Sequence, residues 1–170
     1  MTIIAEISER RSVREYAAKP VEEEKLNRVL EAGRLAPSAR NQQDWRILVI
    51  DDVPLKERLV AAASPHQPFL KQAPIILVAC ALNPAYVMRC GHPAYLIDLA
   101  IVLEHIALQA VREGLGTCWI GSFDENQARE ALGVPPAVPI VELMSLGYPA
   151  RLPAARGRKT AEELYHRGAW

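Results

Sequence analysis

The segment from residue 94 to residue 113 constrains the fold more than any other part of the sequence. It predicts the longest helix, and hydrophobic side chains lie on nearly every face of that helix. Such a helix has to be covered on several sides, by a sheet of its own chain and by a second subunit. Asp98, Glu104 and His105 interrupt the apolar run and argue against a helix that spans a membrane. We therefore expect a globular protein, without a membrane partner, built around this helix.

Shorter helices and strands are predicted on both sides of this segment. Helices are expected at residues 2–11, 20–35, 53–63 and 124–132, and strands at 45–50, 74–81, 117–121 and 140–146. The run 74–81 is apolar without interruption, which is typical of a strand buried on both faces. This order of elements indicates an α/β or α+β layered domain around a sheet of four or five strands.

The chain is expected to form a single domain over residues 1–170. This length suffices for one hydrophobic core and is short for two. Residues 151–170 are expected to form an extended tail. Its first ten residues are basic, interrupted by proline and poor in large apolar side chains, so the tail cannot make a core of its own.

Charge and cysteine content exclude several classes of protein. Lys and Arg together number 20, as do Asp and Glu, so the formal net charge is zero and no overall field attracts nucleic acid or an anionic membrane. The three cysteines are odd in number and lack the CxxC spacing, which favours a reducing cytoplasm over a disulfide framework. Residues 1–14 lack the long apolar core of a signal peptide. Cys90 and His92 lack a second ligand pair at zinc spacing, so no metal site is expected.

Positive charge is concentrated near both ends of the chain. The first cluster consists of Arg10, Arg11, Ser12 and Arg14, and the second of Arg156, Arg158 and Lys159. Guanidinium groups donate paired hydrogen bonds to phosphate oxygens, so the first cluster suits a phosphate dianion. Each cluster also has a simpler interpretation, as a basic helix end or a solvated charge run. If the two termini meet in space, a phosphate held between them explains why a neutral chain carries its positive charge at its ends.

Two polar loops are the other candidate binding segments. Pro37, Ser38 and Asn41 lie in a loop whose hydroxyl and amide groups suit a polar ring edge or a ribityl chain. Gly121 and Ser122 form a turn between a predicted strand and helix, where backbone N–H groups can approach a flat ligand closely. An ordinary surface loop and an ordinary strand-to-helix connection remain the alternatives. No pairing of a nucleophile with a base is evident, which indicates a cofactor that brings its own chemistry.

Taken together, these segments resemble the nitroreductase family of flavoproteins. The matching segments are residues 7–16, residues 30–38 with Asn41, Gln43 and Trp45, the helix from about residue 98 with residues 114–124, and residues 147–149 with the basic tail. They occur in the expected order from about residue 7 to residue 159. The resemblance implies an α+β three-layer sandwich with a central, mostly antiparallel sheet of four to five strands and helices on both faces. It also implies an intertwined homodimer, in which the C-terminal tail extends onto the partner and FMN lies at the subunit interface.

The resemblance further implies a role for each matching residue. Those that would hold the FMN phosphate are Arg10, Arg11, Ser12, Arg156, Arg158 and Lys159. Arg14 would lie near the ribityl chain and the pyrimidine edge of the flavin. Pro37, Ser38 and Asn41 would reach the flavin from the partner subunit. The amides of Gly121 and Ser122 would face flavin N5 and O4.

The chemistry implied is hydride transfer from NADH or NADPH through flavin N5 to a small acceptor, by a ping-pong mechanism. Nitroaromatics, quinones and free flavins are the acceptors expected, and no side chain is assigned a catalytic role. Three alternatives stay open. They are a flavin-binding storage or sensor module without turnover, an enzyme of the same fold with other chemistry such as reductive dehalogenation or flavin destruction, and a structural or nucleic-acid-binding dimer that uses the basic termini.

Overall fold

The computed structural model describes residues 3–170, and the start of the first predicted helix, at residue 2, lies outside them. Four strands, β1 (Trp45–Ile50), β2 (Ile75–Ala81), β3 (Gly116–Ile120) and β4 (Ile140–Gly147), form one sheet in the order β1-β2-β4-β3. Every neighbouring pair is antiparallel, from Trp45 opposite Ala81 near one edge to Ile120 opposite Leu143 at the other. The expectation of an antiparallel sheet of four to five strands is confirmed.

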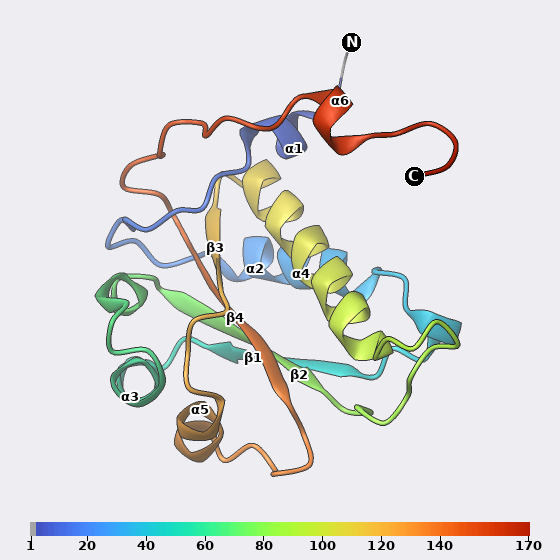
Figure 1. The fold of residues 1–170 in the computed structure, drawn as a ribbon. Coiled ribbons are helices and arrows are strands. Elements are labelled where there is room, and N and C mark those ends of the chain that lie inside the picture. Colours follow the sequence, from blue (N-terminus) through green and yellow to red (C-terminus); the bar gives the residue numbers. More distant parts are fainter. Residues whose placement is uncertain (1–2) are drawn as a thin grey trace.

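Helices form a layer on each face of this sheet (Figure 1). One layer consists of α2 (Glu23–Arg34) and α4 (Ala94–Arg112), and the other of α3 (Val53–Ala63) and α5 (Glu125–Leu132). Two hydrophobic clusters fill the spaces between the layers, one on each side of the sheet. All seven residues of β2 are buried because this central strand contributes alternate side chains to both clusters. The three-layer α+β sandwich is therefore confirmed.

The long apolar helix α4 is buried along one face. Leu99, Leu103 and Ile106 pack against α2 and the sheet, whereas Leu96 and Ile97 keep 46% and 45% of their surface exposed. By length and composition, α4 is the one helix within residues 3–170 that is apolar enough to cross a membrane, and 44% of its apolar stretch is buried inside the fold. We interpret it as a core helix with one uncovered apolar side.

Two helix starts differ from the sequence-based expectation. The first helix, α1, covers only Ala5–Glu9, within the predicted span 2–11. The prediction that the second helix begins at Pro20 is wrong, since α2 begins at Glu23 after an extended Glu22. Two short 3-10 helices, η1 (Ala39–Asn41) and η2 (Pro68–Lys71), were not expected, because a single turn leaves no hydrophobic periodicity in the sequence.

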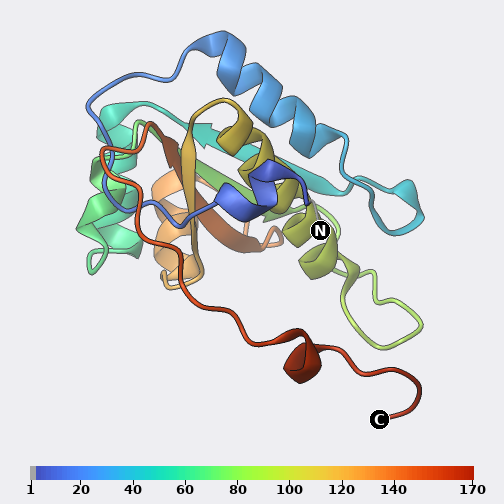
Figure 2. The same cartoon turned by 90° about the horizontal axis from the view of Figure 1, so that it is seen from above.

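The tail after β4 is extended and makes no core, as expected. Its residues are exposed from Ala150 to Trp170. A single helical turn, α6 (Ala161–Leu164), begins at Thr160, whose side chain accepts a hydrogen bond from the backbone of Glu163. Seen from above, the tail leaves the sandwich and runs past α1 into open space (Figure 2).

Candidate functional site

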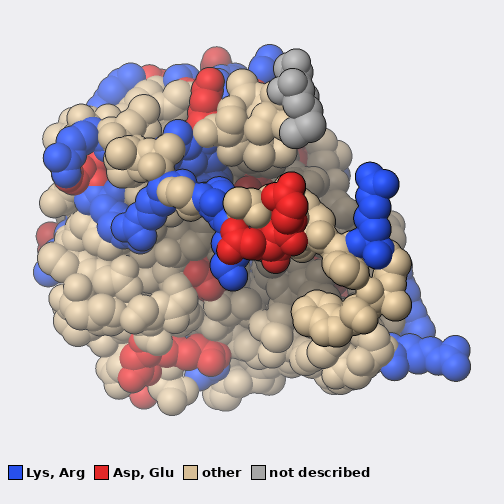
Figure 3. Space-filling model, turned by 45° about the horizontal axis from the view of Figure 1, so that its top comes forward, with Lys and Arg blue, Asp and Glu red and all other residues tan. Residues whose placement is uncertain are grey.

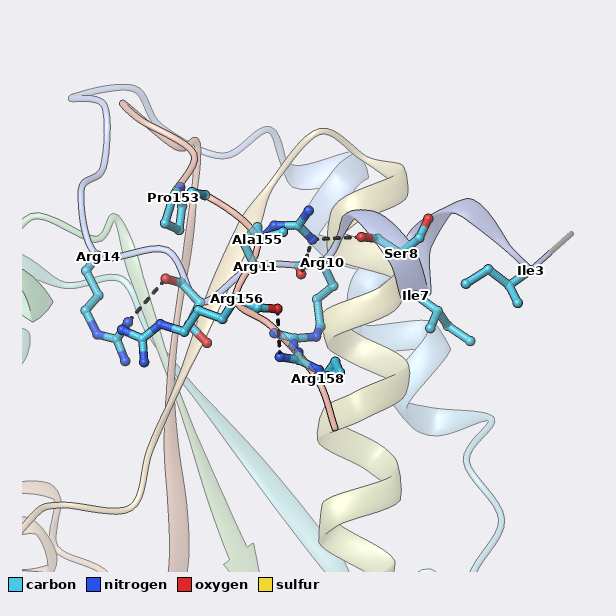
Figure 4. Close-up of a pocket in the computed structure, with 12 residues that line it drawn as sticks. Ile3, Ile7, Ser8, Arg10, Arg11, Arg14, Pro153, Ala155, Arg156 and Arg158 are labelled. Carbon is cyan, nitrogen blue, oxygen red and sulfur yellow. Dashed lines mark hydrogen bonds between the residues drawn. The ribbon is translucent and has the colours of Figure 1, made fainter. Parts of the chain in front are cut away.

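Both basic clusters line one cleft, of about 490 Å³, between α1 and the tail (Figure 4). The polar residues that line it are Ser8, Arg10, Arg11, Ser12, Arg14, Arg156 and Arg158. Six of the residues singled out from the sequence are thus brought together from opposite ends of the chain. Lys159 follows directly in the tail but does not line the cleft.

The segment that carries Arg10 and Arg14 is fastened to the edge strand β3. Ser12 pairs with Thr117 in a parallel bridge, and the backbone N–H of Val13 donates to the Thr117 carbonyl at 2.9 Å. The Val13 side chain is fully buried against this strand. A Cβ at Gly116 would lie 2.4 Å from Val13 Cγ2, so this close approach requires glycine.

The arginines in the cleft differ in their hydrogen-bond and ion-pair partners within the chain. Arg11 donates to the carbonyls of Ser8 at 2.7 Å and Arg10 at 2.9 Å, so its guanidinium turns toward the end of α1. The guanidinium groups of Arg10 and Arg158 point toward one another (Figure 4), and Arg10 lies 3.9 Å from the Glu104 carboxylate. Arg14, Arg156 and Arg158 make no ion pair within residues 3–170.

This concentration of like charge favours an anionic ligand. Figure 3 shows Lys and Arg side chains gathered on the face that carries the cleft. Guanidinium groups close to one another repel unless an anion neutralises them. Glu104 is a single carboxyl group beside five cleft arginines; burial raises its pKa, and Arg10 acts in the opposite direction. The cleft therefore has the chemistry of a phosphate site.

The turn at Gly121 and Ser122 follows the far end of β3. Three side chains from the segment between α3 and β2 hold Ser122. Its carbonyl accepts from Ser64 Oγ at 3.2 Å and from Gln67 Nε2 at 2.8 Å, and its hydroxyl lies 3.0 Å from His66 Nε2. These three residues were not predicted as site residues, and their only signal in the sequence is a run of polar residues after a predicted helix. Gly121 and Ser122 are exposed and do not line the arginine cleft itself.

The loop with Pro37, Ser38 and Asn41 lies elsewhere, at the N-terminal end of α4. Asp98 in the first turns of α4 anchors it, because its Oδ1 accepts from the Ala39 backbone N–H at 3.0 Å. The arginine cleft lies by α1, which is tied to the other end of α4 by an ion pair between Glu6 and Arg112. One chain therefore does not bring this loop to its own cleft.

The same loop is conformationally unusual. Arg40, Asn41 and Gln43 have φ angles of 54°, 55° and 54°, in a left-handed region that non-glycine residues seldom occupy. Ser38 Oγ accepts from the Gln43 backbone N–H at 3.0 Å, and Arg40 stacks 4.9 Å from the centre of the Tyr86 ring. Strained backbone of this kind persists where the surroundings fix it, and it is concentrated at binding sites.

Cys90 and His92 lie in an exposed turn, where the Met88 N–H donates to the His92 carbonyl at 2.9 Å. Within residues 3–170 there is no group of three His, Cys, Asp or Glu side chains placed to hold a metal ion.

A model of the nitroreductase family matches residues 7–66 and 60–148 of the chain, which is most of its length. The chain belongs to the nitroreductase family. The match spans both sides of the sheet, the segment 10–14 and the turn after β3. It also confirms the family resemblance expected from the four sequence segments.

Several members of the nitroreductase family are similar to this chain. An NADH dehydrogenase of Thermus thermophilus is 33% identical over 172 residues, covering 83% of each protein. An FMN reductase [NAD(P)H] of Bacillus subtilis is 28% identical over 181 residues, covering 96% of this chain and 72% of the relative. The solved structure of an FMN-dependent nitroreductase of Clostridium difficile superposes with a TM-score of 0.86 at 28% identity, over 99% of this chain and all of the other.

Proposed function

We propose that this nitroreductase-family protein is an FMN-dependent oxidoreductase that takes hydride from NADH or NADPH and passes it to a small acceptor. Nitroaromatics, quinones and free flavins are the acceptors proposed. Relatives named for NADH dehydrogenase, FMN reductase [NAD(P)H] and FMN-dependent nitroreductase activity support this function. The observation that carries it for this chain is the cleft in which arginines from both termini converge.

The donors of this cleft fit the phosphate of FMN. A phosphate monoester carries close to two negative charges at neutral pH and accepts several hydrogen bonds. Arg10, Arg158 and Arg156 supply guanidinium donors, and Ser12 supplies a hydroxyl. Arg11 contributes charge while its guanidinium caps the end of α1. The volume of about 490 Å³ exceeds what a phosphate alone needs and leaves room for the sugar-like chain attached to it.

The flavin ring would lie along β3, from the arginine cleft toward the turn at Gly121 and Ser122. Arg14 stands at the start of this path, with its guanidinium 6.0 Å from the centre of the Phe69 ring. β3 is an edge strand, so its outward backbone N–H groups are available to a ligand beyond the point where Ser12 pairs with it. The fixed Ser122 carbonyl keeps the turn at the end of this path in place.

The loop with Pro37, Ser38 and Asn41 would complete the site from a second copy of the chain. The uncovered side of α4, with Leu96 and Ile97 half exposed, is the apolar surface on which that copy would pack. A shallow apolar groove beside it, lined by Leu35, Leu108 and His105 among others, extends the same surface. A homodimer would cover both features and place one subunit's loop against the other's cleft. We also propose a cytoplasmic location, in keeping with the unpaired cysteines.

Bound FMN supplies the electron-transfer chemistry of the proposed reaction. The protein's own residues would bind the cofactor and orient it. Arg10 and Arg158 would neutralise the phosphate, and Arg14 would place positive charge near the pyrimidine edge of the flavin. The backbone of Gly121 and Ser122 holds hydrogen-bond donors at the edge of the ring, and the partner's loop restricts access of water. Rate enhancement then comes from position and electrostatics.

An absorption spectrum tests the proposal. The purified protein is mixed with FMN, freed of excess and treated anaerobically with NADH or NADPH. Retained flavin bands that bleach support the proposed function. Bands that persist with both donors contradict turnover and favour a flavin-binding module, and the absence of retained flavin contradicts the cofactor. An acceptor panel with nitroaromatics, quinones, free flavin and halogenated aromatics then separates nitroreductase chemistry from dehalogenation.

Two arginine variants assign the binding to the cleft. Arg10→Ala and Arg158→Ala each remove a charged donor that contributes about 1.5–3 kcal/mol, so the Kd for FMN is expected to rise roughly 10- to 100-fold. Arg58→Ala is the matched control, because Arg58 lies on α3, on the other face of the sheet, and donates to the Ala131 carbonyl. An equal loss of affinity in all three variants would mean that the effect is not local to the cleft.

A further inference from the structure

Glu142 places a carboxyl group directly beside the turn at Gly121. It lies on β4, one residue before Leu143, which pairs with Ile120 at the end of β3. A Cβ built on Gly121 would lie 3.4 Å from Glu142 Oε2 and 3.7 Å from Oε1. Because Gly121 has no side chain, this carboxyl group lies next to the turn whose backbone amides would face the ring edge in the proposed function. No role for it follows from the family resemblance.

The surroundings of Glu142 are poor in compensating charge. The residue is half buried, and it makes no ion pair with any residue between 3 and 170. Burial raises the pKa of its carboxyl group, while a hydrogen bond with the Ile120 backbone acts in the opposite direction. Such a group holds a proton over a wider range of pH than an ordinary glutamate does.

Three other titratable side chains lie on β3, on β2 and in the segment that holds the turn. On β3, burial raises the pKa of the Cys118 thiol; Arg14 and Arg10 lower it, and the Glu142 carboxylate raises it further. On β2, burial raises the pKa of Cys80 to about 11, against the effect of Arg46 on β1. Beyond the turn, His66 reaches Ser122 Oγ. Among these groups Glu142 carries the carboxyl group. Its charge acts on the pKa of Cys118, which Arg14 and Arg10 also affect.

We propose that Glu142 is the proton donor of the oxidative half-reaction, delivering a proton to the acceptor while hydride is transferred to it. This inference rests on the proposed function. Reduction of a quinone by hydride brings two electrons and one hydrogen, so the hydroquinone needs one further proton. The Glu142 O–H bond breaks, the proton goes to the acceptor oxygen, and the carboxylate left behind regains a proton from water.

The neighbouring groups are less suited to this role. Cys118 and Cys80 are buried thiols with raised pKa values. His66 is exposed, and its Nε2 is already engaged by Ser122 Oγ at 3.0 Å. Glu142 alone among them combines a carboxyl group, partial burial and contact with Gly121.

The two half-reactions, measured separately on the FMN-loaded protein, test this proposal. Glu142→Gln keeps the shape of the side chain and removes the proton. Oxidation of the reduced protein by a quinone is expected to slow about 100-fold, whereas reduction by NADH or NADPH, which needs no proton donor, changes less than about threefold. The wild-type oxidation rate should fall as pH rises through the pKa of Glu142, and the variant should lack that step. Equal oxidation rates in both proteins would overturn the proposal.

A control and a second readout keep the test decisive. Glu130→Gln removes the same charge from an exposed position on α5 and is expected to leave both half-reactions unchanged. Carbon-13 NMR of the FMN-free protein should show the Glu142 carboxyl titrating above its ordinary value of 4.5. If Glu142→Gln does not fold, the wild type decides: the carboxyl titration of the loaded protein and its oxidation rate must share one pKa. Different values would refute the role of Glu142, whereas failure to bind or reduce FMN refutes the proposed function instead.

Discussion

The backbone N–H of Val13 donates to the carbonyl of Thr117 at 2.9 Å, and this contact ties the arginine segment to the edge of the sheet. Val13 is fully buried, so the residues on either side of it are held rather than free. Arg10 and Arg14 therefore start from a fixed backbone and lose less conformational freedom on binding an anion. Preorganisation of this kind distinguishes a binding site from a solvated basic helix end.

Gly116→Ala should disrupt this contact. The new Cβ would lie 2.4 Å from Val13 Cγ2 and 3.0 Å from Pro149 Cγ, so the arginine segment would have to move. Overpacking of this kind is expected to lower the free energy of unfolding by about 1–3 kcal/mol. Urea denaturation of the FMN-free protein measures this change. FMN affinity should fall as well. Gly157→Ala in the tail is the control, since nothing lies within 4 Å of its Cβ position. Equal stability of the Gly116 variant and the wild type would mean that Val13 relaxes at no cost.

Asp98→Ala should release the loop at the N-terminal end of α4. The partly buried Ala39 N–H would lose its acceptor, and the loss of a hydrogen bond to a charged group costs about 1–3 kcal/mol. The backbone amide of Ala39 should then exchange its hydrogen faster, as measured by hydrogen–deuterium exchange. Because Asp98 is remote from the arginine cleft, binding of inorganic phosphate by the FMN-free protein should stay as in the wild type. Protection of Ala39 in the variant would contradict the anchoring role.

The sequence predicted the elements with long periodic patterns and missed contacts that depend on tertiary structure. The apolar run of β2 and the amphipathic face of α2 could be predicted, because each pattern is contained within a single segment of the sequence. The start of α2 was misplaced, since Pro20 is compatible with a first helical turn but does not require one.

The contacts missed by the sequence join distant segments. Asp98 was recognised only as a charge in the long helix, and its bond to Ala39 spans 59 positions. Glu142 sits in an apolar strand pattern, and its proximity to Gly121 arises only from the register between β3 and β4. The basic clusters, by contrast, were recognisable because three basic residues stand within five positions at residues 10–14 and three within four positions at residues 156–159, although only folding brings the two segments together.

A hydrogen bond between Tyr148 and Glu22 makes the free energy of unfolding depend on pH in the acid range. The Tyr148 hydroxyl donates to Glu22 Oε2 at 2.5 Å, and this bond, aided by Lys19, lowers the pKa of Glu22 from 4.5 to about 2. The lowered pKa stabilises the folded state above pH 4.5, and that contribution is lost as pH falls toward 2. In Tyr148→Phe the pKa of Glu22 should rise toward its ordinary value, as followed by carbon-13 NMR of its carboxyl group. Tyr165→Phe, in the exposed tail, should leave it unchanged, and an unshifted Glu22 in the first variant would assign the effect to the backbone hydrogen bond of Glu22 and to Lys19.

Ile97→Lys tests whether a second subunit packs against the uncovered side of α4. Ile97 lies on the uncovered side of α4 with 45% of its surface exposed, next to Leu96. A lysine buried there without a partner costs about 3 kcal/mol, so the dissociation constant of the dimer should rise roughly 100-fold. Sedimentation equilibrium measures this directly.

The control for that variant is Val53→Lys. Val53 is the first residue of α3, on the opposite face of the sheet, and 55% of its surface is exposed. This substitution adds the same charge and should leave the association state unchanged. FMN retention should follow the dimer, because in the proposed site the loop with Asn41 comes from another copy. A monomeric Ile97 variant that still binds FMN as tightly as the wild type would show that one subunit suffices for the cofactor, and the interface site would have to be abandoned.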